Sequence, residues 1–334
     1  MEKQLEVVKE YKYLGYFFTT KLSPNVALVC FASRGKAALI QICRTLNKLL
    51  YVVSDLFFKI FDCQIQPILL YASEVWGLGK SNIIETVHLY GLKRFLNVSV
   101  KTPNIMIYGD TGRYPLSVNA TMRVAKYWVK ILGMEENRLP KRVYRMLLQN
   151  IDYEYNWTYK LRSMLRENGL AHLWQSQTVE CKASFFRRLK ESLINRYSDT
   201  WVEELNRSER YATFRIFKSV FQVEPYLYYV DKKIFRETLV KFRFGENERY
   251  FQHRYDDLFV PQCQMCNEEE GDEYHLLVRC PAANDLREKY LAPHVHVSDD
   301  SNAFRQLMSA QDQETIRAVG TYLYHIQRRR EVTR

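Results

Sequence analysis

Several features that would mark a particular class of protein are scarce in this sequence. Twelve Gly and nine Pro are few for 334 residues, which argues against collagen-like, linker-rich and many-turned all-β chains. The opening residues, MEKQLEVVKEYK, contain no apolar core of a signal peptide. The longest apolar stretch, FFKIFDCQIQPILLYASEVW, carries Lys59, Asp62, Gln64 and Gln66, so we expect it not to cross a bilayer. We therefore expect an intracellular protein, nuclear or cytoplasmic, with no membrane partner.

The motifs of common enzyme sites are missing as well. The sequence has no Walker A loop, no GxGxxG, no HExxH and no GxSxG. Asp256 and Asp257 form a carboxylate pair, but Tyr255 adjoins them directly, whereas a polymerase palm uses aromatic-x-Asp-Asp. Asp231 and Lys233 match a nuclease D-x-K, but no acidic strand precedes them. We identify no catalytic site and expect the isolated chain not to be an enzyme.

What the sequence does have is an uneven distribution of charge. The net charge is +11, from 49 basic and 38 acidic residues. Residues 1–150 hold 21 Lys and Arg against 10 Asp and Glu, whereas residues 151–334 hold 28 of each. Because nucleic acids are polyanions, the basic first half favours a contact with their phosphates. The alternative is a solvated basic face with no partner.

Hydrophobic periodicity predicts a mainly α protein that begins with a β-hairpin. Leu5 to Val8 and Tyr11 to Phe18 have strand composition, and Lys9 and Glu10 would link them. Helices are predicted over residues 24–50 and 82–96, from Pro115 onward, and over the last 30 residues. Another helix is predicted to start at Ser54, with Leu56, Ile60 and Cys63 on one face, and to kink or end at Pro67. Shorter helices are predicted between residues 133 and 243, with breaks at Asp152, Asn168-Gly169, Asp199 and Pro225. The Pro- and Gly-containing segment 100–116 is predicted as a loop up to Pro115.

The strongest local motif is CQMCNEEEGDEYHLLVRC. Cys263, Cys266, His275 and Cys280 have the spacing C-x2-C-x8-H-x4-C, which supplies three sulfurs and one nitrogen to a single ion. Zn²⁺ prefers such a set, and a shell filled by protein leaves no position for a catalytic water. We therefore predict one structural zinc, against the alternative of four scattered groups without metal. The acidic loop of the motif would repel phosphate, so we expect the zinc region to stabilise the neighbouring segments and not to bind nucleic acid.

The other cysteines need no ligand. Cys30, Cys43, Cys63 and Cys181 fall in predicted helical segments, where we expect buried, small hydrophobic side chains.

Several segments resemble the C-terminal part of reverse transcriptases from non-LTR (LINE-type) retrotransposons. YKYLGYFF is similar to the strand that follows the palm active site, and its Tyr13, Leu14 and Gly15 match the YLG of the primer-grip hairpin. ILLYASEVWG (Ile68–Gly77) is similar to the thumb segment LLYGSExW, with Ala72 in place of Gly. HLYGLKRFLNVSVKTPNIMIYGDTGRYPL resembles a run that ends in YGELGRYPL. The CCHC motif follows, as it does in many such elements.

The resemblance implies a truncated copy. In the family the fingers, the palm and an endonuclease precede the YLG strand, whereas here only ten residues precede Tyr11. The residues after Cys280 are too few for the restriction-like nuclease that some members append. Together with the patterns above, this divides the chain into five segments: a β-hairpin (1–21), a basic helical thumb-like domain (22–150), a helical linker (151–250), the CCHC zinc region (251–295) and a C-terminal helix (296–334).

The leading hypothesis is a reverse-transcriptase remnant that lacks the polymerase site and binds nucleic acid without regard to sequence. A DNA or RNA duplex, or a hybrid, would be the partner, and a separately encoded palm or endonuclease part is a second possible partner. The basic residues expected to contact phosphate are Arg34, Lys36, Lys93, Arg94, Lys101, Arg113 and Lys126. The alternative is a zinc-stapled helical scaffold, an interaction protein or an inert remnant, with no nucleic-acid role.

Overall fold

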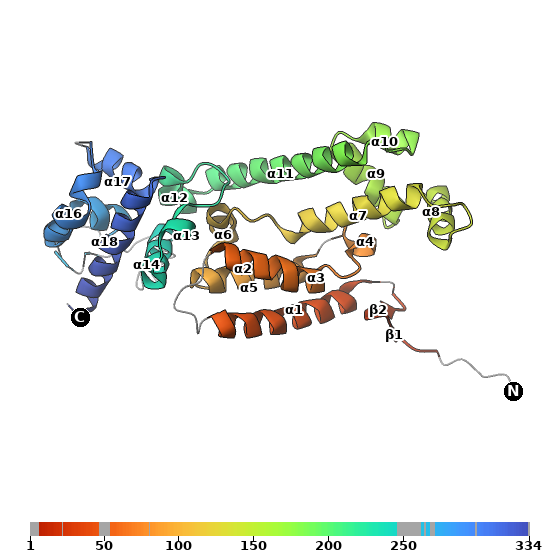
Figure 1. Ribbon diagram of the computed structural model, residues 1–334, viewed down its shortest axis with the longest axis horizontal. Helices are drawn as coiled ribbons and strands as arrows, with labels where there is room; N and C mark the ends of the chain where they lie inside the picture. The colour runs from red at the N-terminus through yellow and green to blue at the C-terminus, as the bar shows by residue number, and fades with distance from the viewer. Residues whose placement is uncertain are drawn as a thin grey trace. The chain divides into compact units, whose positions relative to one another are not determined.

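The computed structural model describes residues 7–21, 23–46, 54–79, 81–245, 262–263, 265–267, 271–297 and 299–332. These residues are mostly helical, with one two-stranded sheet (Figure 1), as the sequence predicts. The carboxylate pair Asp256-Asp257 lies outside the described residues. The strand predicted over Leu5 to Val8 lies partly outside them.

The chain divides into two compact units. Unit 1 comprises Met1–Gln41, Ile60–His88 and Tyr114–Asp199. Unit 2 comprises Ile42–Lys59, Leu89–Arg113 and Thr200–Arg334. Each unit collects residues from both sides of position 150, so neither coincides with one of the five predicted segments.

The first half of the chain contains both strands. Its elements are β1 (Glu10–Tyr13), β2 (Tyr16–Thr19), α1 (Asn25–Leu46), α2 (Ser54–Ile60), a π-helical turn (Phe61–Ile65), α3 (Gln66–Leu69), α4 (Ser73–Trp76), α5 (Asn82–Leu96), α6 (Asn104–Thr111), α7 (Leu116–Leu132) and α8 (Leu139–Gln149). The predicted helix 82–96 and the helix start at Pro115 are confirmed.

The second half is mostly helical in its described residues. Its elements are α9 (Trp157–Glu167), α10 (Ala171–Ser176), α11 (Lys182–Arg207), a 3₁₀ turn (Glu209–Tyr211), α12 (Ala212–Phe217), α13 (Tyr226–Tyr229), α14 (Lys233–Arg243), a π-helical turn (His275–Arg279), a 3₁₀ turn (Pro281–Ala283), α16 (Asn284–Tyr290), a 3₁₀ turn (Ala292–His294), α17 (Asp300–Met308) and α18 (Gln313–Val332). The break predicted at Asp199 is wrong, because α11 continues through it to bury Trp201 and Leu205.

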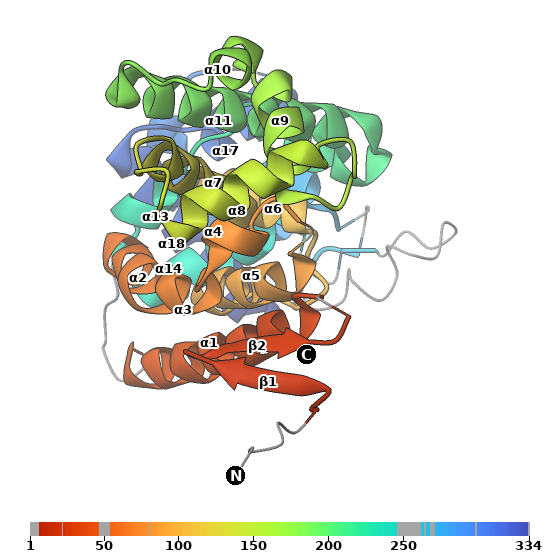
Figure 2. The same cartoon turned by 90° about the vertical axis from the view of Figure 1, so that its right-hand side faces the viewer.

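The N-terminal hairpin is present, but its turn is not at Lys9-Glu10 as predicted. The strands pair with Glu10 opposite Thr19 and Tyr13 opposite Tyr16, so the turn is Leu14-Gly15. Both turn residues have positive φ, 45° and 85°, which a tight two-residue hairpin turn requires. Figure 2 shows β2 beside α1, where the Tyr16 ring packs 6.2 Å from the Phe31 ring.

The helix that begins at Ser54 buries a different face from the predicted one. Phe57, Phe58 and Phe61 are buried, whereas Leu56 and Cys63 are exposed. The helix widens into the π-helical turn before Pro67, which then lies in the first turn of α3, where its missing N–H costs little.

The predicted loop before Pro115 contains a helix, α6. It starts after Pro103 and ends at Gly112, whose φ of 61° is typical of a helix C-terminus. Seven of its residues, Ile105 to Thr111, are buried. The loop prediction was wrong because Pro and Gly mark the two ends of this short helix.

The core of unit 1 is formed by α7, α8, α9 and the first part of α11. Trp128 lies at 0% exposure, and its Nε1 donates to the Tyr144 hydroxyl at 3.0 Å. The packed side chains include Val124, Leu161, Leu165, Phe185 and Leu189. The burial of Val124, Trp128 and Ile131 confirms the predicted inner face of this helix.

In unit 2, α18 packs against α14 and α16. Ile316, Val319, Leu323 and Ile326 are buried along one face of α18, as their helical spacing predicts.

Among the described residues, α1 is the one helix that is long and apolar enough to cross a membrane, by length and composition only. The apolar stretch singled out from the sequence, residues 57–76, follows this helix and does not include it. Buried core helices satisfy the same criterion, and Ala27, Leu28 and Phe31 of α1 are buried. Arg34 and Lys36 lie near its middle, where each charge would cost about 2.5–3.5 kcal/mol in a bilayer.

Candidate metal centre

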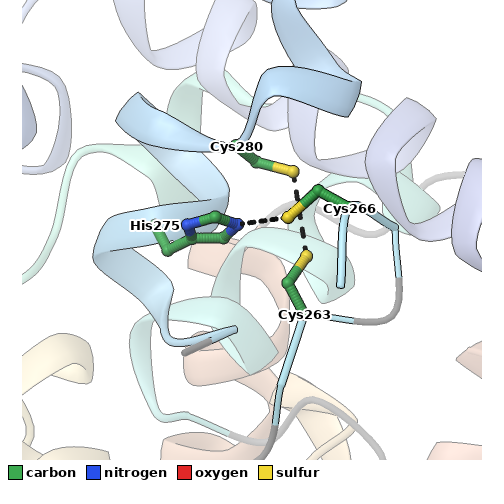
Figure 3. A group of neighbouring side chains, drawn as sticks. All are labelled: Cys263, Cys266, His275 and Cys280. Carbon is green, nitrogen blue, oxygen red and sulfur yellow. Dashed lines mark hydrogen bonds between the residues drawn. The ribbon is translucent and has the colours of Figure 1, made fainter. Parts of the chain in front are cut away.

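The structure brings Cys263, Cys266, His275 and Cys280 into one cluster (Figure 3). Cys263 and Cys266 lie on a tight turn, closed by the Asn267 N–H donating to the Cys263 carbonyl at 2.8 Å. Asn267 has a φ of 59°, a left-handed conformation that asparagine tolerates well. The C-x2-C spacing therefore forms the loop that lets two sulfurs approach one point.

The second pair of ligands flanks a π-helical turn. His275 begins this turn and Cys280 follows it, with the Cys280 N–H donating to the His275 carbonyl at 2.7 Å. The His275 N–H donates to the Asp272 carboxylate at 2.7 Å, which fixes the start of the turn. The wider turn is a local signal of function, since π-helical turns occur frequently at functional sites.

The four donor atoms have the spacing of a tetrahedral zinc shell. The sulfurs of Cys263 and Cys280 are 3.7 Å apart, the Cys266 sulfur is 3.4 Å from His275 Nε2, and all four donors lie within 4.8 Å of one another. Zn–S bonds of about 2.3 Å and Zn–N bonds of about 2.0 Å would place such pairs about 3.8 Å and about 3.5 Å apart. The residues therefore fit a single zinc ion.

Three of the ligands are buried: Cys263, His275 and Cys280 are each 3% exposed or less. The hydrogen bond with Cys280 lowers the pKa of the Cys263 thiol. The same hydrogen bond, with burial, raises the pKa of Cys280. One proton shared between two close sulfurs explains why the pKa of Cys263 is lowered and the pKa of Cys280 is raised. A bound cation would favour thiolates at both positions.

Residues around the ligands connect the centre to α16 and α18. Arg287 donates to the Cys280 carbonyl at 2.5 Å, and the Tyr322 hydroxyl donates to the Leu276 carbonyl at 2.7 Å. Arg329 donates to the Ala282 carbonyl at 2.7 Å. The bonds from Tyr322 and Arg329 join residues more than 40 positions apart, so no local sequence pattern reveals them.

The predicted nucleic-acid contacts lie in both units. Arg34, Lys36 and Lys126 are exposed in unit 1, and Arg94 and Lys101 are exposed in unit 2.

Lys93 and Arg113 have internal contacts. Lys93 is only 9% exposed, and its ammonium donates to the Val100 carbonyl at 2.8 Å. The Arg113 guanidinium lies 5.3 Å from the Phe58 ring centroid. These contacts stabilise the protein itself and make Lys93 a poor phosphate ligand.

The residues predicted to resemble a primer grip form the tip of the hairpin. Tyr13 and Leu14 are exposed, and the Leu14 carbonyl accepts a hydrogen bond of 2.6 Å from the Tyr71 hydroxyl. This bond fixes the position of the turn.

The prediction for the remaining cysteines is wrong in part. Cys63 and Cys181 are exposed, and Cys30 and Cys43 are half-buried, so none of the four is a core side chain. Cys181 precedes α11 and is not helical.

No protein-family model, curated protein or solved structure matches this chain.

Proposed function

We propose that the chain is a reverse-transcriptase-derived protein that binds nucleic acid through its basic first half, catalyses no reaction by itself, and uses one zinc ion as an internal staple. The observation that carries the zinc part of this proposal is the closed Cys3His donor set of Cys263, Cys266, His275 and Cys280. Four protein ligands complete a tetrahedral shell, so the ion has no open position for a substrate or a reactive water.

The zinc would stabilise the fold. Its ligands come from two separate turns, and the carbonyls of Leu276, Cys280 and Ala282 beside them accept hydrogen bonds from α16 and α18. Zinc would hold these turns in the geometry that the helices contact. The chemistry it supplies is the neutralisation of thiolates that would otherwise repel one another.

Nucleic-acid binding is proposed from charge. The excess of Lys and Arg lies within residues 1–150, and Arg34, Lys36 and Lys126 are exposed there. The acidic composition of residues 251–300 argues against the zinc region as the contact surface. Binding should be indifferent to sequence and steeply salt-dependent, because Lys and Arg that neutralise phosphates release counterions. The resemblance in motif order suggests a primer–template duplex.

A fluorescence-anisotropy titration with a labelled DNA–RNA hybrid tests this proposal. The triple substitution Arg34→Ala, Lys36→Ala and Lys126→Ala should weaken binding tenfold or more at low salt. The slope of log K against log salt should become shallower by about 0.9 for each phosphate that the variant no longer neutralises.

The matched control removes three exposed basic residues of α11, by Lys182→Ala, Arg187→Ala and Lys190→Ala. It changes the net charge equally and should alter affinity less than twofold. Absence of binding by the unmodified chain at low salt would overturn the proposal. An equal weakening in the two triple variants would show that overall charge, and not the first half, determines binding.

A cavity in unit 1 favours the alternative function, an interaction scaffold. It has a volume of about 330 Å³, its lining is mostly apolar, and Tyr127, Tyr144 and Trp157 contribute to it. Val75 and Leu139 line it and are 64% and 70% exposed. If the hybrid does not bind, this apolar surface becomes the stronger candidate for a binding function.

A further inference from the structure

The outer edge of β1 is unpaired within the described residues, and its availability for pairing does not depend on the proposed function. β1 pairs with β2 alone, in a two-stranded antiparallel sheet, within the described part of the chain. All four β1 residues are exposed, with Tyr11 at 60% and Tyr13 at 56%. A two-stranded hairpin is only marginally stable in water, and an uncovered strand edge readily pairs with another strand.

The register of the hairpin determines which backbone groups face outward. Tyr13 and Tyr16 close the two-residue turn, and the Thr20 N–H donates to the Lys9 carbonyl at 3.2 Å. Hydrogen-bonded pairs alternate along an antiparallel ladder, so Lys9, Tyr11 and Tyr13 direct their N–H and C=O groups toward β2. Glu10 and Lys12 therefore direct theirs toward the free edge.

The same two residues carry opposite charges. No hydrogen bond or ion pair engages the Glu10 carboxylate within the described residues, and the Lys12 ammonium lies 5.7 Å from the Phe17 ring centroid. Glu10 and Lys12 are two positions apart, so both side chains lie on one face of the strand.

We propose that β1 pairs antiparallel with β1 of a second copy of this chain, about a two-fold axis at Tyr11. Glu10 then lies opposite Lys12 of the partner subunit, and Lys12 lies opposite Glu10 of the partner subunit. Both are outward-facing residues, so each pair exchanges backbone hydrogen bonds and also forms a cross-strand ion pair. Tyr11 lies opposite Tyr11 of the partner subunit on the other face.

Other symmetric registers are less favourable. An axis at Glu10 places two carboxylates opposite each other, and an axis at Lys12 places two ammonium groups opposite each other, which is destabilising. An axis between two residues pairs an outward-facing residue with an inward-facing one, which breaks the hydrogen-bond ladder. Backbone geometry and charge thus select the same register.

The dimer should be weak. A four-residue edge buries far less than the roughly 1,200–2,000 Å² of a standard stable interface. We expect self-association to become measurable only at high protein concentration. Sedimentation equilibrium over a concentration series is therefore the appropriate measurement.

Reversing the charge of Glu10 or Lys12 tests the proposed pairing of the two β1 strands. Glu10→Lys and Lys12→Glu should each reduce the association constant at least fivefold, because each places like charges opposite each other in both pairs. An equimolar mixture of the two variants should associate as well as, or better than, the unmodified chain. The double variant E10K/K12E should recover the unmodified association constant. Monomer at all concentrations for the unmodified chain, or no recovery in the mixture and the double variant, would overturn the proposal.

A cross-link gives a second, independent readout. In a chain carrying Cys63→Ser and Cys181→Ser, Tyr11→Cys would place two cysteines opposite each other at a non-hydrogen-bonded pair, within disulfide range. Mild oxidation should yield a covalent dimer. The matched variant Tyr13→Cys places the cysteine opposite Lys9 of the partner subunit and should cross-link much more slowly. Equal cross-linking of both variants would contradict the proposed register.

Discussion

At the residue scale, unit 2 contains a cluster of buried charged side chains: Asp110, Lys218, Glu224 and Arg243. Arg243 Nε and Nη2 donate to the two Asp110 oxygens at 2.8 and 3.0 Å, and Nη2 is 2.9 Å from Glu224. Lys218 contacts Glu224 at 2.5 Å, and the Tyr226 hydroxyl donates to Asp110 at 2.9 Å. Burial alone would lower the pKa of Arg243, but Asp110 and Glu224 raise it above its ordinary value. The arginine therefore stays charged and joins α6 to α14.

Arg243→Ala should destabilise unit 2 by about 3–5 kcal/mol, because it leaves the buried Asp110 carboxylate without its cation, whereas Glu224 keeps its pair with Lys218. Chemical denaturation followed by tryptophan fluorescence measures this, since Trp201 donates to the Ile105 carbonyl of α6. Lys233→Ala on the same helix is the control. Lys233 forms an ion pair with Glu237, and its side chain is 41% exposed, so its removal should destabilise the protein by less than about 1 kcal/mol. Equal destabilisation in the two variants would contradict this role of the cluster.

A second residue-scale prediction concerns Gly109 of α6. A Cβ at this position would lie 2.6 Å from Cζ2 of the buried Trp201 ring. Gly109→Ala should therefore cost about 1–3 kcal/mol through overpacking. Gly133→Ala, whose Cβ would meet nothing closer than 3.9 Å, should be close to neutral. Thermal unfolding of both variants checks the difference, and an unchanged melting temperature for Gly109→Ala would refute the close contact.

At the element scale, 3.6-residue spacing predicted some long helices, but it did not predict the continuity of α11 through Asp199 or the short helix α6. The helix 82–96 and the buried face of α18 follow from 3.6-residue spacing alone. The hairpin turn was misplaced because Leu14 is an unusual residue at positive φ, so Leu14-Gly15 lacks the usual Asn-Gly signature. α6 was missed because burial against Trp201, a contact between distant residues, stabilises a segment that looks like a loop.

An ion pair between α16 and α18 gives an element-scale prediction that depends on pH. Hydrogen bonds from Arg329, both at 2.6 Å, lower the pKa of Asp285 to about 2. A depressed carboxyl pKa stabilises the fold above the ordinary value of about 3.9, and this contribution disappears as the pH falls through about 2. Because Asp285 is largely exposed, we expect the contribution to be small.

NMR of the Asp285 carboxyl carbon should show a midpoint near pH 2 in the unmodified chain and a midpoint near the ordinary value in Arg329→Ala. Arg328→Ala is the control, since Arg328 pairs with Glu331 and not with Asp285. An unchanged Asp285 midpoint in Arg329→Ala would contradict the assigned cause.

At the scale of the whole molecule, the sequence predicted that Cys263, Cys266, His275 and Cys280 come together, but not the division into two units. Cys263, Cys266, His275 and Cys280 are close in sequence, so their spacing was enough to bring them together. Each unit, in contrast, is assembled from three separate stretches of chain, and no local pattern encodes such an arrangement. Local sequence patterns also did not predict that α16 and α18 contact the Cys3His cluster.

We propose that one zinc ion closes this Cys3His cluster and stabilises the surrounding turns. The most direct test is native mass spectrometry of protein purified under reducing conditions and never exposed to chelator. We predict one zinc per chain in the unmodified protein and none in Cys266→Ser. In this variant, residues 262–295 should exchange their amide hydrogens faster. Its binding to the DNA–RNA hybrid should be retained. A chain that carries no zinc, and whose Cys266→Ser variant folds and exchanges like the unmodified protein, would contradict the account.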